Sequence, residues 1–243
     1  MTTIDQLIQR LKHPTSPLRF VFMGSSNTQR VANFGNAQNW VDWVDLGLAT
    51  WYGKSHYSIN VGISGQTSRD MLERFERDVM EFKPDVVFIT GGGNDCNPVK
   101  DVSLGEFSSN LTAMVRRARQ AGSLVVLQTY YSFDSQAMHE SGEGARAENL
   151  ATYMQLTRDV AAAEATSLID HLPRWERLRL ADLPGYRSLM TDPMHMSALG
   201  HGVFAADVLR VLGCDFTART DVLPMIADAA TIQRRLDELA RQR

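Results

Sequence analysis

Short apolar runs alternate with longer amphipathic stretches over most of this chain. The predicted strands are Phe20–Met23, His56–Val61, Asp85–Thr90, Leu124–Leu127 and Ser167–Asp170, and the apolar runs of the first and the third suit buried strands. Between these runs, apolar residues recur at helical spacing over stretches of about 10 to 18 residues. Strands that alternate with helices of this length predict an α/β fold, in which a parallel sheet is covered by helices on both faces.

The amphipathic stretches also predict where the helices lie. They are an opening helix that ends before Pro14, Gln38–Trp51, a helix that runs from Met71 to Pro84, a helix from Leu104 to Gly122, Ala147–Ala165, Leu172–Leu180 and Ser197–Leu212. The segment Tyr130–Gly144 is too long for a simple connection and is predicted to be a loop. Because no repeat, low-complexity tract or linker interrupts the pattern, we expect one domain over residues 1–243, with a C-terminal helical extension at about 216–243.

The C-terminal extension has an apolar pattern of its own. Apolar residues recur there at alternating steps of three and four, at Val222, Met225, Ala229, Ile232, Leu236 and Leu239. Such a seam suits a partner helix. Two partners fit the pattern: the chain's own domain, or a second copy of the chain in a homo-oligomer.

Composition and charge restrict the classes of function. With 44% hydrophobic residues, 22% charged residues and a net charge of −3, the 243-residue chain is typical of a soluble enzyme. This charge gives no case for a nucleic-acid partner, and the basic clusters Arg116–Arg119 and Arg234–Arg235 fall on helical patterns typical of solvated faces. No apolar window approaches 18 residues and no leader pattern opens the sequence, so we expect no membrane partner and a cytoplasmic location.

Glycine-rich polar segments follow the first three predicted strands. They are Gly24-Ser25-Ser26, Gly62–Gly65 and Gly91–Asn94. The carboxyl ends of parallel strands lie at one edge of a sheet, where ligands bind, so the three segments are expected to meet there. A nucleotide site is the less favoured interpretation, because GxGxxG is absent after the first strand and GxxxxGK[ST] is absent altogether.

A fourth polar segment, Asp192-Pro193-Met194-His195, lies just before a predicted helix. The carboxylate can accept a hydrogen bond from one ring nitrogen of His195, which leaves the other nitrogen to face a nucleophile. Helix capping by Asp192, a structural role for His195, and a metal site completed by His201 are the alternatives, although no strand supplies a further metal ligand. Cys96 is an alternative nucleophile, but a lone cysteine is more often a buried thiol.

Together, GSSNT at 24–28, NVGISGQTS at 60–68, GGGND at 91–95 and DPMH at 192–195 resemble the four blocks of the SGNH hydrolase superfamily, also called GDSL esterases and lipases. The blocks occur in the family's order. The resemblance implies a three-layer α/β/α fold of flavodoxin-like type, with a parallel five-stranded sheet and a serine-esterase site that needs no cofactor and no metal. The absence of GxSxG argues against the α/β-hydrolase fold.

The same resemblance implies roles for individual residues. It assigns Ser26 as nucleophile, His195 as general base and Asp192 as the group that orients the histidine. The oxyanion hole would consist of the amides of Ser26 and Gly65 with the side chain of Asn94. At Gly65, we expect that any side chain would obstruct the substrate.

One position departs from the family pattern. The first block usually has an acid directly before the serine, and this chain has Ser25 there. We expect different hydrogen bonding in the turn, with activity retained.

The substrate is indicated by the segment after the fourth strand. Tyr130, Tyr131 and Phe133 combine flat aromatic faces with small polar neighbours, which suits a sugar or a small acyl ester, and no extended apolar lid is evident. The sequence therefore predicts a serine esterase that removes acetyl or other short acyl groups from a carbohydrate or similar small polar ester. The alternatives are a lipase or thioesterase of the same superfamily, and a sugar- or ester-binding protein without turnover.

Overall fold

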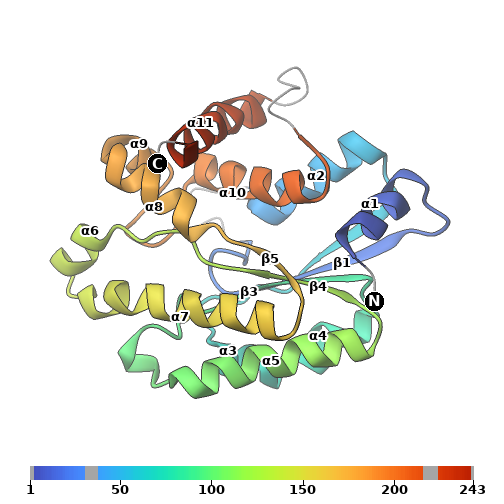
Figure 1. Ribbon diagram of the computed structural model, residues 1–243, viewed down its shortest axis with the longest axis horizontal. Coiled ribbons are helices and arrows are strands. Elements are labelled where there is room, and N and C mark those ends of the chain that lie inside the picture. The colour runs from blue at the N-terminus through green and yellow to red at the C-terminus, as the bar shows by residue number, and fades with distance from the viewer. Residues whose placement is uncertain (1–2, 31–37, 216–223, 242–243) are drawn as a thin grey trace.

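One parallel sheet lies at the centre of the computed structural model, which describes residues 3–30, 38–215 and 224–241 (Figure 1). The strand order is β2-β1-β3-β4-β5, and every neighbouring pair is parallel. The strands are β1 (Leu18–Met23), β2 (His56–Asn60), β3 (Val86–Thr90), β4 (Leu124–Gln128) and β5 (Ser167–Ile169). The predicted five-stranded parallel sheet is therefore confirmed.

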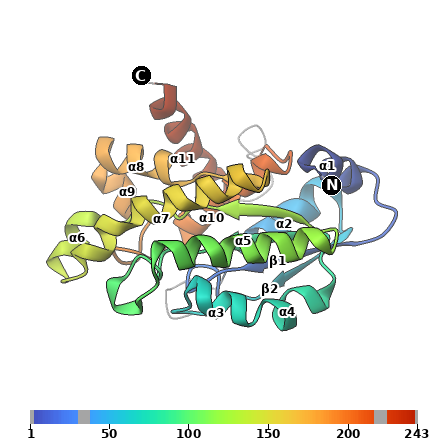
Figure 2. The same cartoon turned by 60° about the horizontal axis from the view of Figure 1, so that its bottom comes forward.

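Helices cover both faces of this sheet, which gives the predicted three layers (Figures 1 and 2). One face carries α3 (Ser68–Glu73), α4 (Phe75–Asp78), α5 (Leu104–Gln120) and α7 (Gly144–Ala163). The other layer contains α1 (Ile4–Lys12), α2 (Trp40–Tyr52), α8 (Leu172–Ala181), α9 (Leu183–Ser188), α10 (Ala198–Val211) and α11 (Pro224–Arg241). Three further short helices are η2 (Met80–Phe82), η3 (Pro98–Lys100) and α6 (Ser135–Glu140).

The sequence of each strand matches its position in the sheet. Every residue of β3 and β4 is buried, because both strands are central and helices lie above and below them. The edge strand β2 is only partly buried, and its sequence HYSIN is correspondingly more polar. Under α2, the rings of Phe22 and Phe88 stack at a centroid distance of 5.0 Å, and Trp40 meets Phe22 edge-on.

The strand order has a consequence for the position of a site. From β1 the chain passes over one face to reach β2, and from β2 it passes over the opposite face to reach β3. The connections therefore change sides next to β1, and ligands of open α/β sheets bind beyond the strand ends at such a switch point. The segments that follow β1 and β3 border this point.

Two predicted elements differ from the structure. The helix predicted from Met71 to Pro84 is divided into α3, α4 and η2, and Arg74 is the C-cap of α3. The side chain of Arg74 is buried and donates to Gln66 Oε1 at 2.6 Å and to Asp78 Oδ2 at 3.1 Å. The predicted loop after β4 contains α6, whose first turn is capped by Asp134.

The C-terminal helix α11 packs on α8 and α10. Its apolar seam faces the chain's own domain: Ala229 and Leu236 are completely buried, and Leu239 nearly so. Val222 and the side chain of Met225 lie outside the described residues. None of the described helices is both long enough and apolar enough to span a bilayer.

Candidate active site

Ser26 lies in a tight turn directly after β1. The turn is closed by the amides of Thr28 and Gln29, which both donate to the carbonyl of Ser25 at 2.9 and 2.8 Å. A Cβ at Gly24 would lie 2.1 Å from the hydroxyl oxygen of Thr28, so the turn requires glycine at this position. As a result, Ser26 projects from the carboxyl edge of the sheet and keeps part of its surface exposed.

The segment before α10 brings His195 to this serine. His195 Nε2 lies 3.0 Å from Ser26 Oγ, although 169 positions separate the two residues in the chain. The other ring nitrogen, Nδ1, lies 2.7 Å from Asp192 Oδ2. Asp192 Oδ1 accepts hydrogen bonds from the amides of Met194 and His195 at 2.9 and 2.8 Å, so the carboxylate is held at both oxygens.

These contacts determine the charge and the tautomer of the pair. Burial acts to raise the pKa of Asp192, but the hydrogen bonds from His195 and the Met194 amide outweigh it and lower the pKa below its ordinary value. An ionised Asp192 favours the proton on Nδ1, which leaves Nε2 to accept a hydrogen bond from the Ser26 hydroxyl. Asp192 is not the cap of the following helix, because Ser197 caps α10.

Asn27 joins the two segments that carry the serine and the histidine. Its Nδ2 donates to the carbonyl of Met194 at 3.2 Å, and its Oδ1 accepts from the amide of Met196 at the same distance. Tyr131 donates to the Met194 carbonyl as well. Asn27 therefore fixes the segment around His195 against the turn around Ser26, a role that the sequence pattern did not indicate.

The turn after β2 supplies an unused amide. Gly65 has φ +75°, and a Cβ built there would meet no atom within 4 Å. The left-handed backbone favours glycine at this position, and the space beside it is open. That a side chain here would obstruct the substrate stays a prediction. Within the described residues, the amides of Ser26 and Gly65 donate to no protein acceptor.

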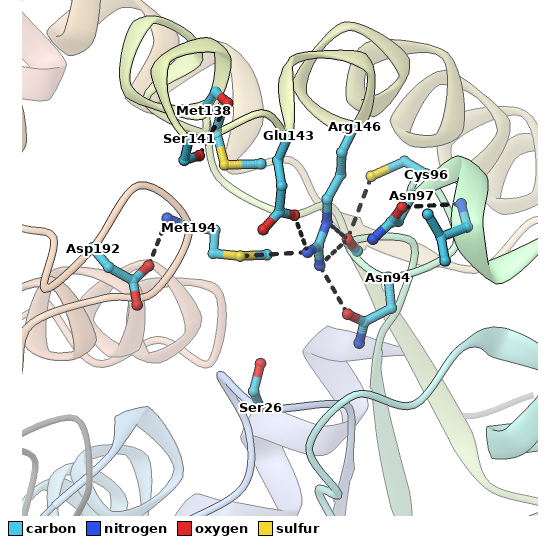
Figure 3. Close-up of polar contacts among 12 residues, drawn as sticks. Ser26, Asn94, Cys96, Asn97, Met138, Ser141, Glu143, Arg146, Asp192 and Met194 are labelled. Atoms are coloured by element: carbon cyan, nitrogen blue, oxygen red, sulfur yellow. Dashed lines mark hydrogen bonds and ion pairs between the residues drawn. The ribbon is translucent and has the colours of Figure 1, made fainter.

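The turn after β3 presents Asn94. Its Nδ2 donates to the carbonyl of Gln66 at 2.8 Å, which joins this turn to the one after β2. The next residue, Asp95, is buried and accepts from the amides of Ser68 and Gly92 at 2.8 and 3.2 Å. Figure 3 shows the Ser26 hydroxyl directed toward the group that contains Asn94.

The aromatic residues after β4 lie beneath the site, which corrects the expectation that they bind substrate. Tyr130, Tyr131 and Phe133 are 3%, 1% and 3% exposed, so their rings belong to the core. Mixed aromatic and polar residues indicated the correct segment, but the pattern does not show which way each ring points.

The departure at Ser25 is explained by one of these rings. Ser25 is buried, and its hydroxyl lies 2.5 Å from the hydroxyl of Tyr130. Burial raises the pKa of Tyr130 to about 12, so the phenol is neutral at physiological pH. An uncharged hydrogen-bonded pair therefore stands where the family usually has an acid, in line with the expected change in bonding.

The two alternatives to the serine, Cys96 as nucleophile and a metal site, are not supported by the described residues. Cys96 is buried, and burial raises its pKa to about 12, which leaves a thiol unsuited to nucleophilic attack. The described part of the chain contains no group of three or more acidic, histidine or cysteine side chains arranged to hold a metal ion.

Comparison with known proteins identifies the family. The profile of the GDSL-like lipase/acylhydrolase family matches residues 22–203, which include all four polar segments. The chain belongs to this family. The resemblance to the SGNH hydrolases is thereby confirmed.

The family relatives include esterases. The chain is 30% identical over 184 residues to the uncharacterised lipoprotein YqeF of Bacillus subtilis, covering 67% of this chain and 72% of YqeF. It is 25% identical over 166 residues to the acetylxylan esterase of Geobacillus stearothermophilus, covering 65% of this chain and 73% of that protein.

Solved structures of family members have the same fold. The crystal structure of Axe2, an acetylxylan esterase from Geobacillus stearothermophilus, matches with a TM-score of 0.69 and 25% identity, covering 82% of this chain and 95% of Axe2. A lipase/acylhydrolase from Enterococcus faecalis matches with a TM-score of 0.65 and 25% identity, covering 81% of this chain and 96% of that protein. The chain therefore has the fold of the SGNH hydrolases.

Proposed function

We propose that this GDSL-family hydrolase is a serine esterase that removes acetyl or other short acyl groups from a carbohydrate or a similar small polar ester. The observation that carries the proposal is the contact of Ser26 Oγ with His195 Nε2 at 3.0 Å, while Asp192 holds the opposite ring nitrogen. A serine hydroxyl is a weak nucleophile until a base removes its proton, and this arrangement supplies the base.

The reaction follows from these groups. His195 takes the Ser26 proton while Ser26 Oγ bonds to the ester carbonyl carbon, and the carbonyl oxygen becomes an oxyanion. His195 then gives this proton to the leaving alcohol as the ester C–O bond breaks, which leaves an acyl-Ser26 intermediate. Water then attacks the acyl carbon while His195 takes a proton from it. His195 gives this proton to Ser26 Oγ as the bond between Oγ and the acyl carbon breaks, which releases the acid and restores the serine.

The developing oxyanion needs fixed hydrogen-bond donors. The unused amides of Ser26 and Gly65 and the side-chain amide of Asn94 are the groups we assign to it. Each such donor is worth about 10²- to 10³-fold in rate. A non-catalytic binding protein would need neither the activated serine nor these donors.

The preference for short acyl groups on a carbohydrate is supported by the relatives. Axe2, which shares the fold over most of this chain, is described as an acetylxylan esterase. Catalytic mutants of Axe2 replace a serine, a histidine or an aspartate by alanine, the residue types that meet at this site.

The nucleophile is tested by Ser26→Ala with p-nitrophenyl acetate as substrate. We expect turnover to fall by roughly 10⁴- to 10⁶-fold, as in other serine triads. Ser109→Ala, on the exposed side of α5, is the matched control and should keep the wild-type rate. A near-normal rate for Ser26→Ala would remove the assignment.

The substrate class is tested by nitrophenyl esters of increasing acyl length, measured beside acetylated xylo-oligosaccharides. We expect kcat/KM to be highest for acetyl and to decline as the chain lengthens, with acetate released from the oligosaccharide. Rising kcat/KM toward long chains would instead assign a lipase or thioesterase.

A further inference from the structure

An arginine is almost completely buried beside the turn that carries Asn94. Arg146 lies in the first turns of α7 and is 8% exposed. Its Nε and Nη2 both donate to the carbonyl of Gly93, at 2.9 and 2.7 Å, and Nη2 also donates to Asn94 Oδ1 at 2.8 Å (Figure 3). The guanidinium therefore holds both the backbone and the side chain of the turn after β3.

The remaining nitrogen of Arg146 has its own contacts. Nη1 donates to Glu143 Oε2 at 3.0 Å and lies 3.4 Å from the sulfur of Met194. The guanidinium carbon is 5.8 Å from the centre of the Phe133 ring. The side chain of Glu143 is 45% exposed, so the counter-charge that pairs with Nη1 is partly solvated while the arginine is enclosed.

Such a buried cation is costly unless its contacts are well formed. Both acceptors on the turn side, the carbonyl of Gly93 and Oδ1 of Asn94, are neutral oxygens and not carboxylates. Met194, which contacts the guanidinium from the other side, is the residue before His195. The positive charge is thus placed between the Asn94 turn and the His195 segment.

The contact with Arg146 determines which way the Asn94 amide faces. Because Oδ1 accepts from the guanidinium, Nδ2 must lie on the opposite side of the amide, away from Arg146 (Figure 3). An amide nitrogen carries two N–H donors, and the Gln66 carbonyl uses one of them. A charge-assisted hydrogen bond to Oδ1 also polarises the amide and strengthens its second N–H as a donor.

We infer that Arg146 is a positioning residue for the oxyanion hole, acting through Asn94. It fixes the orientation of the Asn94 amide, holds the Gly93–Asn94 turn, and increases the strength of the hydrogen bond from Nδ2 to the developing oxyanion. The inference rests on the proposed esterase function. Lysine cannot replace this arginine, because the contacts need several donors in one rigid plane.

The first test compares Arg146→Met and Arg146→Lys with the wild type on p-nitrophenyl acetate. We expect kcat to fall at least tenfold in both variants, while KM changes less than about threefold. The loss of kcat should not exceed the 10²- to 10³-fold expected when one oxyanion donor is lost entirely. Affinity for a short alkylboronic acid, which forms a tetrahedral adduct on Ser26, should fall in parallel with kcat. A kcat within twofold of wild type in either folded variant would overturn the inference.

Arg158→Met is the matched control on the same helix. Arg158 lies about 18 Å further along α7 and is ion-paired with Asp170 at 2.8 Å, so its removal costs a comparable contact away from the site. We expect its kcat to equal the wild-type value. An equal loss of kcat in Arg158→Met would assign the Arg146 effect to the general stability of α7.

A double-mutant cycle separates a role through Asn94 from an independent one. Arg146→Met should lower kcat much less in an Asn94→Ala background than in the wild type, because the amide that it orients is absent. Equal losses in both backgrounds would contradict the inference.

Guanidinium ion at millimolar concentration should restore part of the kcat of Arg146→Ala, whereas urea, which is uncharged, should not.

These measurements also separate the inference from the proposed function. If the wild type does not hydrolyse the ester, or if Ser26→Ala does so equally well, the proposed function fails. If hydrolysis depends on Ser26 but both Arg146 variants keep the wild-type kcat, the role of Arg146 alone is wrong.

Discussion

At the scale of single residues, the hydrogen-bonded pair of Ser25 and Tyr130, next to the turn that carries Ser26, gives the clearest test of stability. Ser25 and Tyr130 share one hydrogen bond and are both buried, and Tyr130 also packs against Gly93, where a Cβ would lie 2.5 Å from its ring. Tyr130→Phe keeps this packing but leaves the Ser25 hydroxyl buried without its partner. We expect a loss of about 1–3 kcal/mol in the free energy of unfolding, measured by urea titration.

The double variant is the control for this prediction. Ser25→Ala with Tyr130→Phe removes both hydroxyls, and replacing both partners of a buried hydrogen bond costs less than removing one. The double variant should therefore be more stable than Tyr130→Phe alone. If the free energy of unfolding of the double variant lies below the wild-type value by the sum of the two single effects, the two hydroxyls do not stabilise each other.

A second residue links the neighbourhood of the site to pH. His201 in α10 is 4% exposed, and its Nδ1 has no hydrogen-bond partner among the described residues. Burial, and secondarily the charge of His195, lower the pKa of His201 to about 3. An unfolded chain has the ordinary histidine value of about 6.5, so between these two pKa values the unfolded state binds the additional proton.

Acid therefore destabilises the fold through His201. The free energy of unfolding should fall by about 1.4 kcal/mol for each pH unit below 6.5, or about 2 kcal/mol at pH 5. His201→Gln cannot take up this proton and should show a flatter dependence between pH 7 and pH 5. Parallel curves for wild type and variant in urea titrations would show that His201 titrates normally in the fold.

At the scale of the elements, the hydrophobic pattern predicted the strands and the long helices and missed short helices. Each predicted strand has a counterpart, because an apolar run between turn residues has few other stable arrangements. Helix α6 was missed because its six residues are too few to show a periodic pattern. Its cap, Asp134, is held by Arg187 at 2.6 Å and by the Pro193 carbonyl, both from distant parts of the chain.

The same distinction holds for the residues of the site. Ser26, Asp192 and His195 could be predicted because each stands in a recognisable polar segment at a strand end or helix start. Arg146 could not, since its partners Gly93 and Asn94 lie more than 50 positions away and an arginine on a helix usually indicates a solvated face. Only the packing of α7 against the turn after β3 turns this arginine toward the site.

At the scale of the whole molecule, α11 completes the layer above α10. Gln233 is buried and donates from Nε2 to the Val203 carbonyl at 2.8 Å and to Asp207 Oδ1 at 3.0 Å. Arg174 of α8 pairs with Asp237 at 2.9 Å and with Asp207 at 2.8 Å. The apolar and polar contacts of α11 therefore join three helices of one chain, which favours the intramolecular interpretation of the seam.

Leu236→Ala tests this interpretation. Leu236 is completely buried, so we expect the free energy of unfolding to fall by about 2–5 kcal/mol with no change in mass by light scattering. Leu180→Ala on α8, where the leucine is 71% exposed, is the matched control and should change stability by less than about 0.5 kcal/mol.

Deletion of residues 216–243 extends the same test to the whole helix. It would expose the faces of α8 and α10 that Ala229, Leu236 and Leu239 cover and would remove the Gln233 contact with the buried carboxylate of Asp207. Because buried apolar surface and a buried hydrogen bond are lost together, the melting temperature should fall well below that of Leu236→Ala. A truncated chain that keeps its melting temperature but has a smaller oligomeric mass would show instead that the helix binds a second copy.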